Sequence, residues 1–397
     1  MTPGPDPHLG GRKLSRRGFL AGVPGGLLAS RIGGTPLGES QKESSRPSIP
    51  ITTREGEELP VVLRPLDRQI WEEELSGFVP QRVFDAHCHM YQREFDLNYR
   101  AALGSRTDFT AETVWRDCDL EVVKTAESVV MLGRRITRLA FPFPFRRCDF
   151  EKSNQFIAAE ISKEQGSAAL MLVEPAMSSG QVEKTILRHR LLGLKPYPSY
   201  CLRQECRITD FLPEHQIAIA DRYGLLIMLH VGMKESFADS RNLDDLIRLT
   251  GKYPRAKWIL AHGARSFAPF PIEKAAPKLR GIPNIWYEVS AVCTMESFDA
   301  LFSGVEVDRI LYGADSGDVG FGRGKIVFYG KSWGDLTPRT NNLGGQLTFY
   351  LYEQLRAMRK AAIRVGLTRK QIEDIFFTTA DRLVGSVAQA LEGVPQV

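Results

Sequence analysis

Four short strings of chemically reactive residues constrain what this chain can fold into. Each follows a short apolar run of the kind that forms a buried β-strand, and together they hold four of the seven histidines. The strings are Asp85-Ala86-His87-Cys88-His89, Leu229-His230-Val231, Ala261-His262-Gly263 and Gly313-Ala314-Asp315-Ser316. Parallel strands that close into a barrel bring such residues together at one end. The spacing therefore indicates an α/β fold, a (β/α)8 TIM barrel with a polar site at the carboxyl ends of its strands.

From residue 81 onward, short β-type runs alternate with amphipathic helical stretches, which is typical of βα units around a parallel sheet. Eight strands are predicted, at 82–89, 128–132, 169–174, 193–197, 225–230, 257–262, 284–289 and 309–315. Helices are predicted at 150–165, 181–192, 210–223, 243–253, 272–279, 297–302 and 346–365, and from Thr368 onward. The glycine-rich, polar segment 316–346 is predicted to be a loop over the barrel mouth. The first strand is not followed by a glycine-rich phosphate loop, which favours a barrel over a doubly wound sheet.

The residues before the barrel carry most of the net charge. The chain has a formal charge of +5. Residues 1–34 contribute +4 of this, from five basic residues and Asp6. The remainder is close to neutral, so the sequence shows no electrostatic footprint for nucleic acid.

The amino terminus has the pattern of an export signal. Ser15-Arg16-Arg17-Gly18-Phe19-Leu20 resembles the twin-arginine motif, and the apolar run 20–28 is too short and glycine-rich for a membrane span. We expect 1–35 to be a twin-arginine signal segment read by export machinery, 36–80 to be a polar linker with a lead-in helix at 67–75, and 81–397 to be the catalytic barrel. The expected location is periplasmic or extracellular. Cys201 and Cys206 lie close enough to pair after export, and the sequence leaves open whether they do.

The first string supplies two metal ligands from one strand. Residues two apart in a strand project from the same face, so His87 and His89 point together into the barrel while Cys88 points outward. A catalytic zinc site needs at least three protein ligands and an open position for water. His230, His262 and Asp315 each close a strand and are the residues available to complete the set.

With these motifs the chain resembles the amidohydrolase superfamily, and within it the amidohydrolase-related family of metal-dependent hydrolases and decarboxylases, over roughly residues 82–384. The resemblance implies that His87, His89, His230 and Asp315 bind a divalent metal, with zinc the expected ion. It implies that His262 sits beside the metal, where it polarises the substrate or relays a proton. Lys195, which ends the fourth predicted strand, either bridges a second metal or faces the substrate as a cation, so one ion or two remain open.

Two further residues belong to the predicted site. Asp85 shares the inward face of the first strand but lies deeper, so we expect it to hydrogen-bond the ligands or support the barrel floor. Arg265, shortly after His262, is a candidate cation for a substrate carboxylate.

The predicted reaction is hydrolysis of an ester, lactone or amide bond in a small molecule by metal-activated water, with Asp315 and His262 as catalytic residues. The same residues also suit non-oxidative decarboxylation of an aromatic or unsaturated acid. A third alternative, from a different class, is an exported barrel that binds a ligand or a metal without turnover. The sequence does not fix the substrate, the metal, the oligomeric state or the cleavage site of the leader.

Overall fold

The computed structural model describes residues 61–98, 117–201, 206–233, 235–338, 340–341 and 344–395. The predicted signal segment at 1–35, and the part of the predicted linker that precedes residue 61, lie outside these residues. Helix α1 (Pro65–Ile70) and the π-helical turn Trp71–Leu75 occupy the place of the predicted lead-in helix. Among the described residues, none of the helices is long and apolar enough to cross a membrane.

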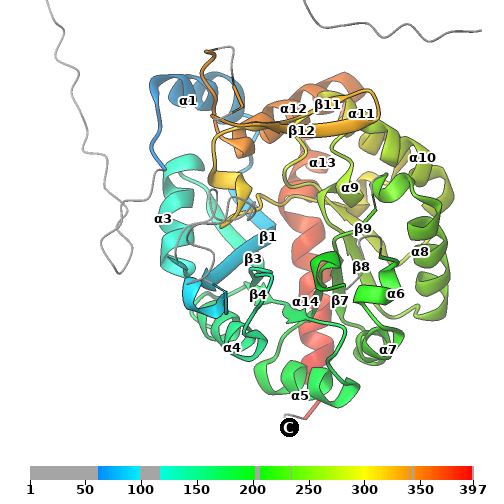
Figure 1. Ribbon diagram of the computed structural model, residues 1–397. Helices are drawn as coiled ribbons and strands as arrows, with labels where there is room; N and C mark the ends of the chain where they lie inside the picture. The colour runs from blue at the N-terminus through cyan, green and yellow to red at the C-terminus, as the bar shows by residue number, and fades with distance from the viewer. Residues whose placement is uncertain are drawn as a thin grey trace, which may run out of the picture. The chain divides into compact units, whose positions relative to one another are not determined.

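Short parallel strands surround the barrel axis in the described part of the chain, which confirms the predicted fold class (Figure 1). In chain order they are β1 (Arg82–Gln92), β3 (Arg135–Pro142), β4 (Ala168–Ala169) with β5 (Met171–Val173), β6 (Gly193–Pro196), β7 (Leu226–Leu229), β8 (Lys257–Leu260), β9 (Ile285–Glu288) and β10 (Ile310–Leu311). Strand β7 is buried along its whole length, as is typical of a parallel strand covered on both faces. Strand β2 (Asp117–Cys118) adds an antiparallel pair to the end of β1.

The strands divide into two sheets, ordered β2-β1-β3-β4 and β10-β9-β8-β7-β6-β5, which backbone hydrogen bonds join at two seams. At the first seam, Leu170 lies between β4 and β5 and donates to the carbonyl of Ala140 at 2.8 Å. At the second seam, the Ala86 amide donates to the carbonyl of Tyr312 at 3.0 Å, and the His89 amide donates to that of Ser316 at 2.7 Å. The segment that follows β10 therefore runs beside β1 and brings Asp315 next to the two histidines.

The predicted second strand is wrong. The apolar run at 128–132 is mostly the end of helix α3 (Leu120–Val130), and the second barrel strand is β3 (Arg135–Pro142). The Asp119 side chain caps α3 by accepting from the Val122 amide, and the helix buries Val123, Ala126 and Val130 on one face. A run of β-branched residues thus formed a helix because its cap and its apolar spacing both favoured one.

Helices cover the outside of the barrel, as α7, α8 and α10 do around β7, β8 and β9 in Figure 1. The helices that follow α3 are α4 (Phe150–Ile161), α5 (Ser179–His189), α6 (Ile208–Phe211), α7 (Glu214–Tyr223), α8 (Ser240–Lys252), the short turn α9 (His262–Arg265), α10 (Pro269–Leu279), α11 (Met295–Gly304), α12 (Tyr350–Val365), α13 (Arg369–Glu373) and α14 (Thr379–Glu392). The predicted helix at 210–223 is divided because Pro213 starts a new helix. Thr368 caps α13 as predicted, in a capping box with Gln371.

The segment predicted to be a loop over the mouth contains a β-hairpin. Strands β11 (Lys325–Tyr329) and β12 (Ser332–Leu336) pair in antiparallel register across a turn at Gly330, which has a φ of 55°. Trp333 on β12 packs against Phe267, with ring centroids 4.7 Å apart. The hairpin therefore contacts the loop that follows His262.

The C-terminal segment covers the amino ends of the strands. The π-helical turn Asp374–Thr378 links α13 to α14 and contacts β1. The Arg82 guanidinium lies over the ring of Phe377, 3.8 Å from its centroid, and the Tyr312 amide donates to the carbonyl of Ile375 at 2.9 Å. With one end of the barrel covered in this way, the polar site lies at the other.

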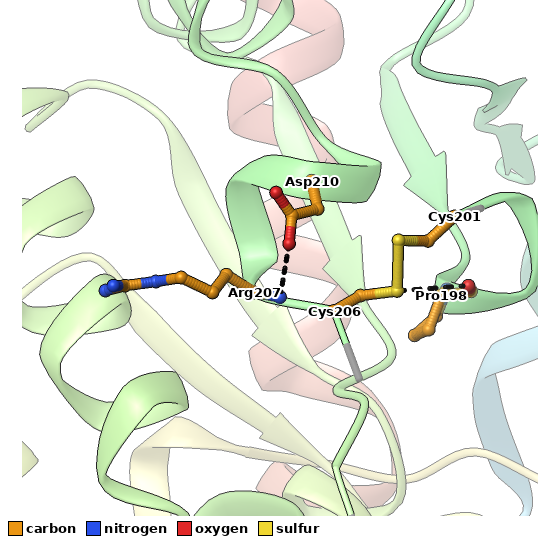
Figure 2. The surroundings of a disulfide bond; sticks show 5 residues. All are labelled: Pro198, Cys201, Cys206, Arg207 and Asp210. Atoms are coloured by element: carbon orange, nitrogen blue, oxygen red, sulfur yellow. Dashed lines mark hydrogen bonds between the residues drawn. A yellow bond between two sulfur atoms is a disulfide. The ribbon is translucent and has the colours of Figure 1, made fainter. Parts of the chain in front are cut away.

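Cys201 and Cys206, whose pairing the sequence leaves open, form a disulfide in the connection between β6 and α6 (Figure 2). Directly after it, the Arg207 amide donates to the Asp210 carboxylate at 3.0 Å and so begins α6. The other four cysteines are free and buried.

Candidate metal centre

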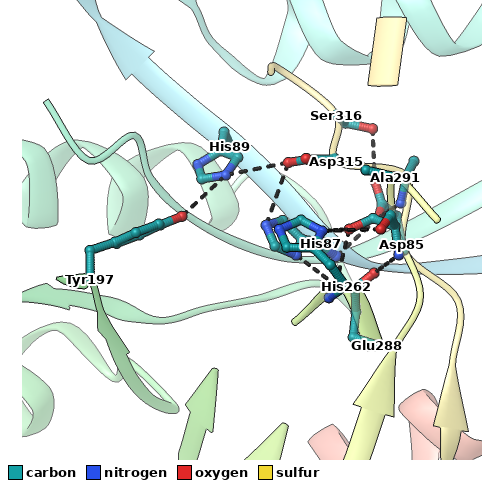
Figure 3. A network of polar contacts seen from close by, with 12 residues as sticks. Asp85, His87, His89, Tyr197, His262, Glu288, Ala291, Asp315 and Ser316 are labelled. Atoms are coloured by element: carbon teal, nitrogen blue, oxygen red, sulfur yellow. Dashed lines mark hydrogen bonds and ion pairs between the residues drawn. The ribbon is translucent and has the colours of Figure 1, made fainter. Parts of the chain in front are cut away.

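The polar residues at the carboxyl ends of the strands converge on one point (Figure 3). His87 and His89 lie on β1, Tyr197 follows β6, His262 follows β8, Glu288 ends β9 and Asp315 follows β10. These segments are far apart in the sequence and meet only because the barrel places the same end of every strand together. Residues of three of the four predicted strings are thus brought to a single cluster, and the string around His230 adjoins it.

Asp315 lies between the two histidines of the first strand. Its Oδ1 atom is 3.5 Å from Nε2 of His87 and 3.5 Å from Nε2 of His89. All three side chains are buried, and Oδ1 has no hydrogen-bond partner within the described part of the chain. A buried carboxylate oxygen that faces two ring nitrogens without a hydrogen bond is the arrangement expected of residues that share a cation.

Glu288, which sequence reasoning missed, orients His87 from the other side of its ring. The carboxylate is fully buried and lies 2.7 Å from Nδ1 of His87, which directs Nε2 toward Asp315. It also accepts from the amide of His262 at 3.2 Å and from the amide and hydroxyl of Ser290. The sequence does place Glu288 near the end of the seventh predicted strand. An acid at the end of a strand is common in proteins without a functional role, so this position alone did not identify it.

Among the residues that the structure describes, two groups of side chains could each hold a metal ion, and both contain Asp315. One combines it with His87 and His262, the other with His89 and Asp318, and in each group the ligand atoms lie within 4.8 Å of one another. The Nδ1 atom of His262 is 3.0 Å from the carbonyl oxygen of Ser290, which fixes its ring. Asp318 is a second residue that the sequence did not single out.

His230, predicted to be a ligand, belongs to neither of these groups. Its ring is 5.2 Å from that of His262 and stacks on that of Tyr197 at 5.6 Å, measured between centroids. Its Nδ1 atom has no hydrogen-bond partner among the residues described. His262, which the sequence analysis placed beside the metal, is therefore grouped with the candidate ligands His87 and Asp315. His230 adjoins this cluster.

Asp85 lies behind the cluster, where it holds backbone in place. It accepts from the amide of His87 at 3.0 Å, from the amide of Ala314 at 2.8 Å and from the hydroxyl of Ser316 at 2.7 Å. Burial raises the pKa of Asp85 to about 6 despite these three donors. By linking β1 to the segment after β10, Asp85 fixes the distance between His87 and Asp315.

The two predicted substrate cations border the cluster. Lys195 is fully buried, with Nζ 4.3 Å from the ring centroid of Phe141 and without a hydrogen-bond partner in the described residues. Burial lowers the pKa of Lys195 to about 7. The Arg265 guanidinium lies 5.4 Å from the ring centroid of Trp333 and donates to the carbonyl of Val231 at 3.3 Å. Neither cation has a carboxylate partner in the described ranges, so both remain available to an anionic substrate.

The backbone is strained where it carries these side chains. His262, Arg265 and Asp315 each have a φ of 56°, in the left-handed region that non-glycine residues seldom adopt. Such residues cost on the order of 1–3 kcal/mol each and persist where the surrounding structure fixes them. Three such residues in one cluster indicate that the surrounding structure holds these side chains in place at a cost in backbone conformational energy.

The protonation states suit a bound cation. Burial lowers the pKa of His87, His89 and His230 well below the usual value and that of His262 to about 4, so the imidazoles are neutral. Burial, together with the nearby Asp318 charge, raises the pKa of Asp315. Neutral imidazoles and a carboxylate are the donor set of zinc and related divalent ions, and a bound cation would displace the proton that burial favours on Asp315. The residues present therefore fit a divalent metal.

We expect the Glu288→Gln substitution to weaken metal binding by roughly 10- to 100-fold, because the amide no longer supplies the negative charge that orients His87. Competitive titration with a chromogenic chelator measures this affinity. Glu273→Gln, a change at an exposed acid on α10, is the matched control and should leave it unchanged. An unaltered affinity in Glu288→Gln would show that this carboxylate does not support the centre.

Part of the chain is similar to a known protein family. Residues 190–385 match the family model described as Amidohydrolase, a span that includes Lys195, His230, His262 and Asp315. This match supports an amidohydrolase-superfamily protein. Members of the family are enzymes, which sets aside the alternative of a barrel without turnover, and they bind a divalent metal. No curated protein matches the chain.

Solved structures that resemble the chain include three with named activities. The 4-oxalomesaconate hydratase LigJ of Rhodopseudomonas palustris has 15% identity, covers 78% of this chain and 98% of its own, and gives a TM-score of 0.48. The 5-carboxyvanillate decarboxylase LigW of Sphingomonas paucimobilis has 13% identity, with coverages of 77% and 99% and a TM-score of 0.47. The LigW2 enzyme of Novosphingobium aromaticivorans, solved with bound manganese, has 12% identity, coverages of 77% and 97% and a TM-score of 0.49.

Proposed function

We propose that the protein is a metal-dependent hydrolase that cleaves an ester, lactone or amide bond of a small molecule. The observation that carries the proposal is the position of Asp315, whose Oδ1 atom lies 3.5 Å from Nε2 of both His87 and His89. A carboxylate at this point can share a cation with the histidines and still accept a proton from a water molecule beside it.

His87, His89, His262 and Asp315 would hold the cation, with His230 next to them. Zinc is the proposed ion, because it accepts neutral imidazole together with carboxylate. A divalent metal supplies Lewis acidity, which lowers the pKa of water toward 7 and polarises a substrate oxygen. Asp318 forms a second group with His89 and Asp315, which could hold a second ion. The number of metal ions bound per chain decides between one ion and two.

The chain's own residues supply the rest of the chemistry. Asp315 accepts a proton from the attacking water and returns it to the leaving group. Lys195 and Arg265 bind a substrate carboxylate, since neither has an acidic partner among the described residues. Phe267 and Trp333 pack together above His262 and exclude water from that side.

Decarboxylation of an aromatic or unsaturated acid is the second candidate. One observation favours it: the Lys195 ammonium lies 4.3 Å from the ring centroid of Phe141 and 4.9 Å from that of Tyr197, without a carboxylate partner in the described residues. A buried cation flanked by two rings suits a carboxylate carried on a flat, unsaturated molecule. The two candidates differ in the product, which a direct assay separates.

Metal-stripped protein reloaded with zinc should hydrolyse at least one class within a panel of carboxylate-bearing esters, lactones and amides, while the stripped protein should not. Carbon dioxide release from a panel of hydroxybenzoates and unsaturated diacids is measured in parallel. Zinc-dependent hydrolysis without carbon dioxide supports the first candidate. Zinc-dependent carbon dioxide release without hydrolysis would replace it with the second, and equal turnover with and without metal would reject both.

A further inference from the structure

Tyr197 directs its hydroxyl group into the cluster from the side opposite Glu288 (Figure 3). The phenol oxygen lies 3.4 Å from Nε2 of His89. The same nitrogen is 3.5 Å from Oδ1 of Asp315. The hydroxyl therefore points at the place where His89 and Asp315 converge. Neither the family resemblance nor the sequence motifs gave Tyr197 a role.

The ring of Tyr197 is held in this orientation by its surroundings. It follows β6 directly, is flanked by Pro196 and Pro198, and is buried. Its face stacks on His230, with centroids 5.6 Å apart and planes at 30°. A side chain packed in this way loses little conformational freedom when it acts on a ligand, which is the condition for a preorganised donor.

The hydrogen bond to His89 cannot coexist with a metal on the same nitrogen. Nε2 of a neutral imidazole offers one lone pair, which accepts either the phenol hydrogen or a cation. In the described part of the chain the hydroxyl of Tyr197 makes no other hydrogen bond. When His89 serves as a ligand, the phenol is left as a free donor beside the metal.

We propose that Tyr197 is a catalytic residue, whose phenol donates a hydrogen bond to the substrate oxygen that acquires negative charge during the reaction. This proposal rests on the proposed hydrolytic function. The phenol transfers no proton: it stabilises the charge that develops when water adds to the carbonyl, and the proton exchanged with the leaving group stays with Asp315. Such a donor acts on the transition state more than on the bound substrate.

The test is Tyr197→Phe, which removes only the hydroxyl. In the zinc enzyme kcat should fall by roughly 10²- to 10³-fold, the effect of losing one oxyanion donor, while KM changes by less than about threefold. Zinc affinity should rise by roughly 2- to 10-fold, because metal binding no longer breaks a hydrogen bond. Tyr200→Phe is the matched control, since the Tyr200 hydroxyl donates to the carbonyl of Phe145 at 3.0 Å, and it should change none of these values.

Binding of methylphosphonate to the zinc protein, measured by calorimetry, separates this proposal from the proposed function. The tetrahedral oxyanion should bind about tenfold or more weakly to Tyr197→Phe. If the wild type hydrolyses nothing and this difference persists, hydrolysis is rejected, whereas the hydrogen bond from Tyr197 to a bound oxyanion is supported. If turnover and phosphonate affinity are both unchanged in Tyr197→Phe, or if the wild type neither hydrolyses any ester nor binds the phosphonate, the proposal is overturned.

Discussion

Asparagine in place of Asp315 is expected to lower turnover by a factor on the order of 10³ or more and to leave the purified protein with much less than its normal metal content. The amide keeps the size of the side chain but loses the negative charge that faces His87 and His89 at 3.5 Å. It also cannot accept the proton that general base catalysis requires, a contribution of roughly 10²- to 10⁴-fold by itself. Steady-state kinetics and elemental analysis of the same preparation measure both effects.

Asp308→Asn is the matched control for this experiment. Asp308 is an exposed acid just before β10, whereas Asp315 is a buried acid just after it. The control should keep its activity and its metal. Full activity in Asp315→Asn would show that Asp315 is not needed for catalysis. Normal metal content with lost turnover would show that Asp315 transfers protons but is not required to bind the metal.

Methionine in place of Arg138 is expected to lower the free energy of unfolding by about 3–5 kcal/mol, a large share of the stability of a typical domain. Arg138 is fully buried on β3, where its guanidinium lies 2.8 Å from the Glu127 carboxylate and 2.6 Å from that of Glu164. Removing the cation leaves Glu127 buried without a counter-charge, although burial already raises the pKa of this group to about 7. Urea unfolding followed by circular dichroism measures the change.

Two further variants test whether the unpaired Glu127 carboxylate causes this loss of stability. Arg135→Met, at an exposed position on the same strand, should cost less than about 1 kcal/mol. Adding Glu127→Gln to Arg138→Met should recover part of the loss, because it removes the unpaired carboxylate. If the single Arg138 variant is as stable as the wild type, this ion-pair network contributes nothing to stability.

The fold could be predicted from the sequence because the βα alternation is regular and because the strands end in recognisable strings. The period of two in a strand placed His87 and His89 on one face, and the structure has them on one side of β1 with Asp315 between them. The strand at 128–132 failed because β-branched residues within a capped helix have the same composition as a short strand. The hairpin of β11 and β12 was missed although the turn at Gly330 is a usable signal.

The site was harder to predict, because its details depend on distances across the barrel. His230 and His262 close neighbouring strands, and the sequence alone does not show that His262 is the one grouped with His87 and Asp315. Glu288 and Tyr197 carry no motif. Their roles appear only when β6 and β9 are placed beside β1, so no local pattern could have separated them from other acids and tyrosines at strand ends.

The central claim, that these side chains hold a divalent metal, is tested most directly by anomalous diffraction from crystals of the zinc-loaded protein, collected on both sides of the zinc absorption edge. We expect an edge-dependent peak within coordination distance of ring nitrogens of His87 and His89 and of an oxygen of Asp315, about 2.0–2.2 Å for nitrogen and oxygen ligands. A fully loaded crystal without a peak at this cluster, or with its peak at other residues, would contradict it.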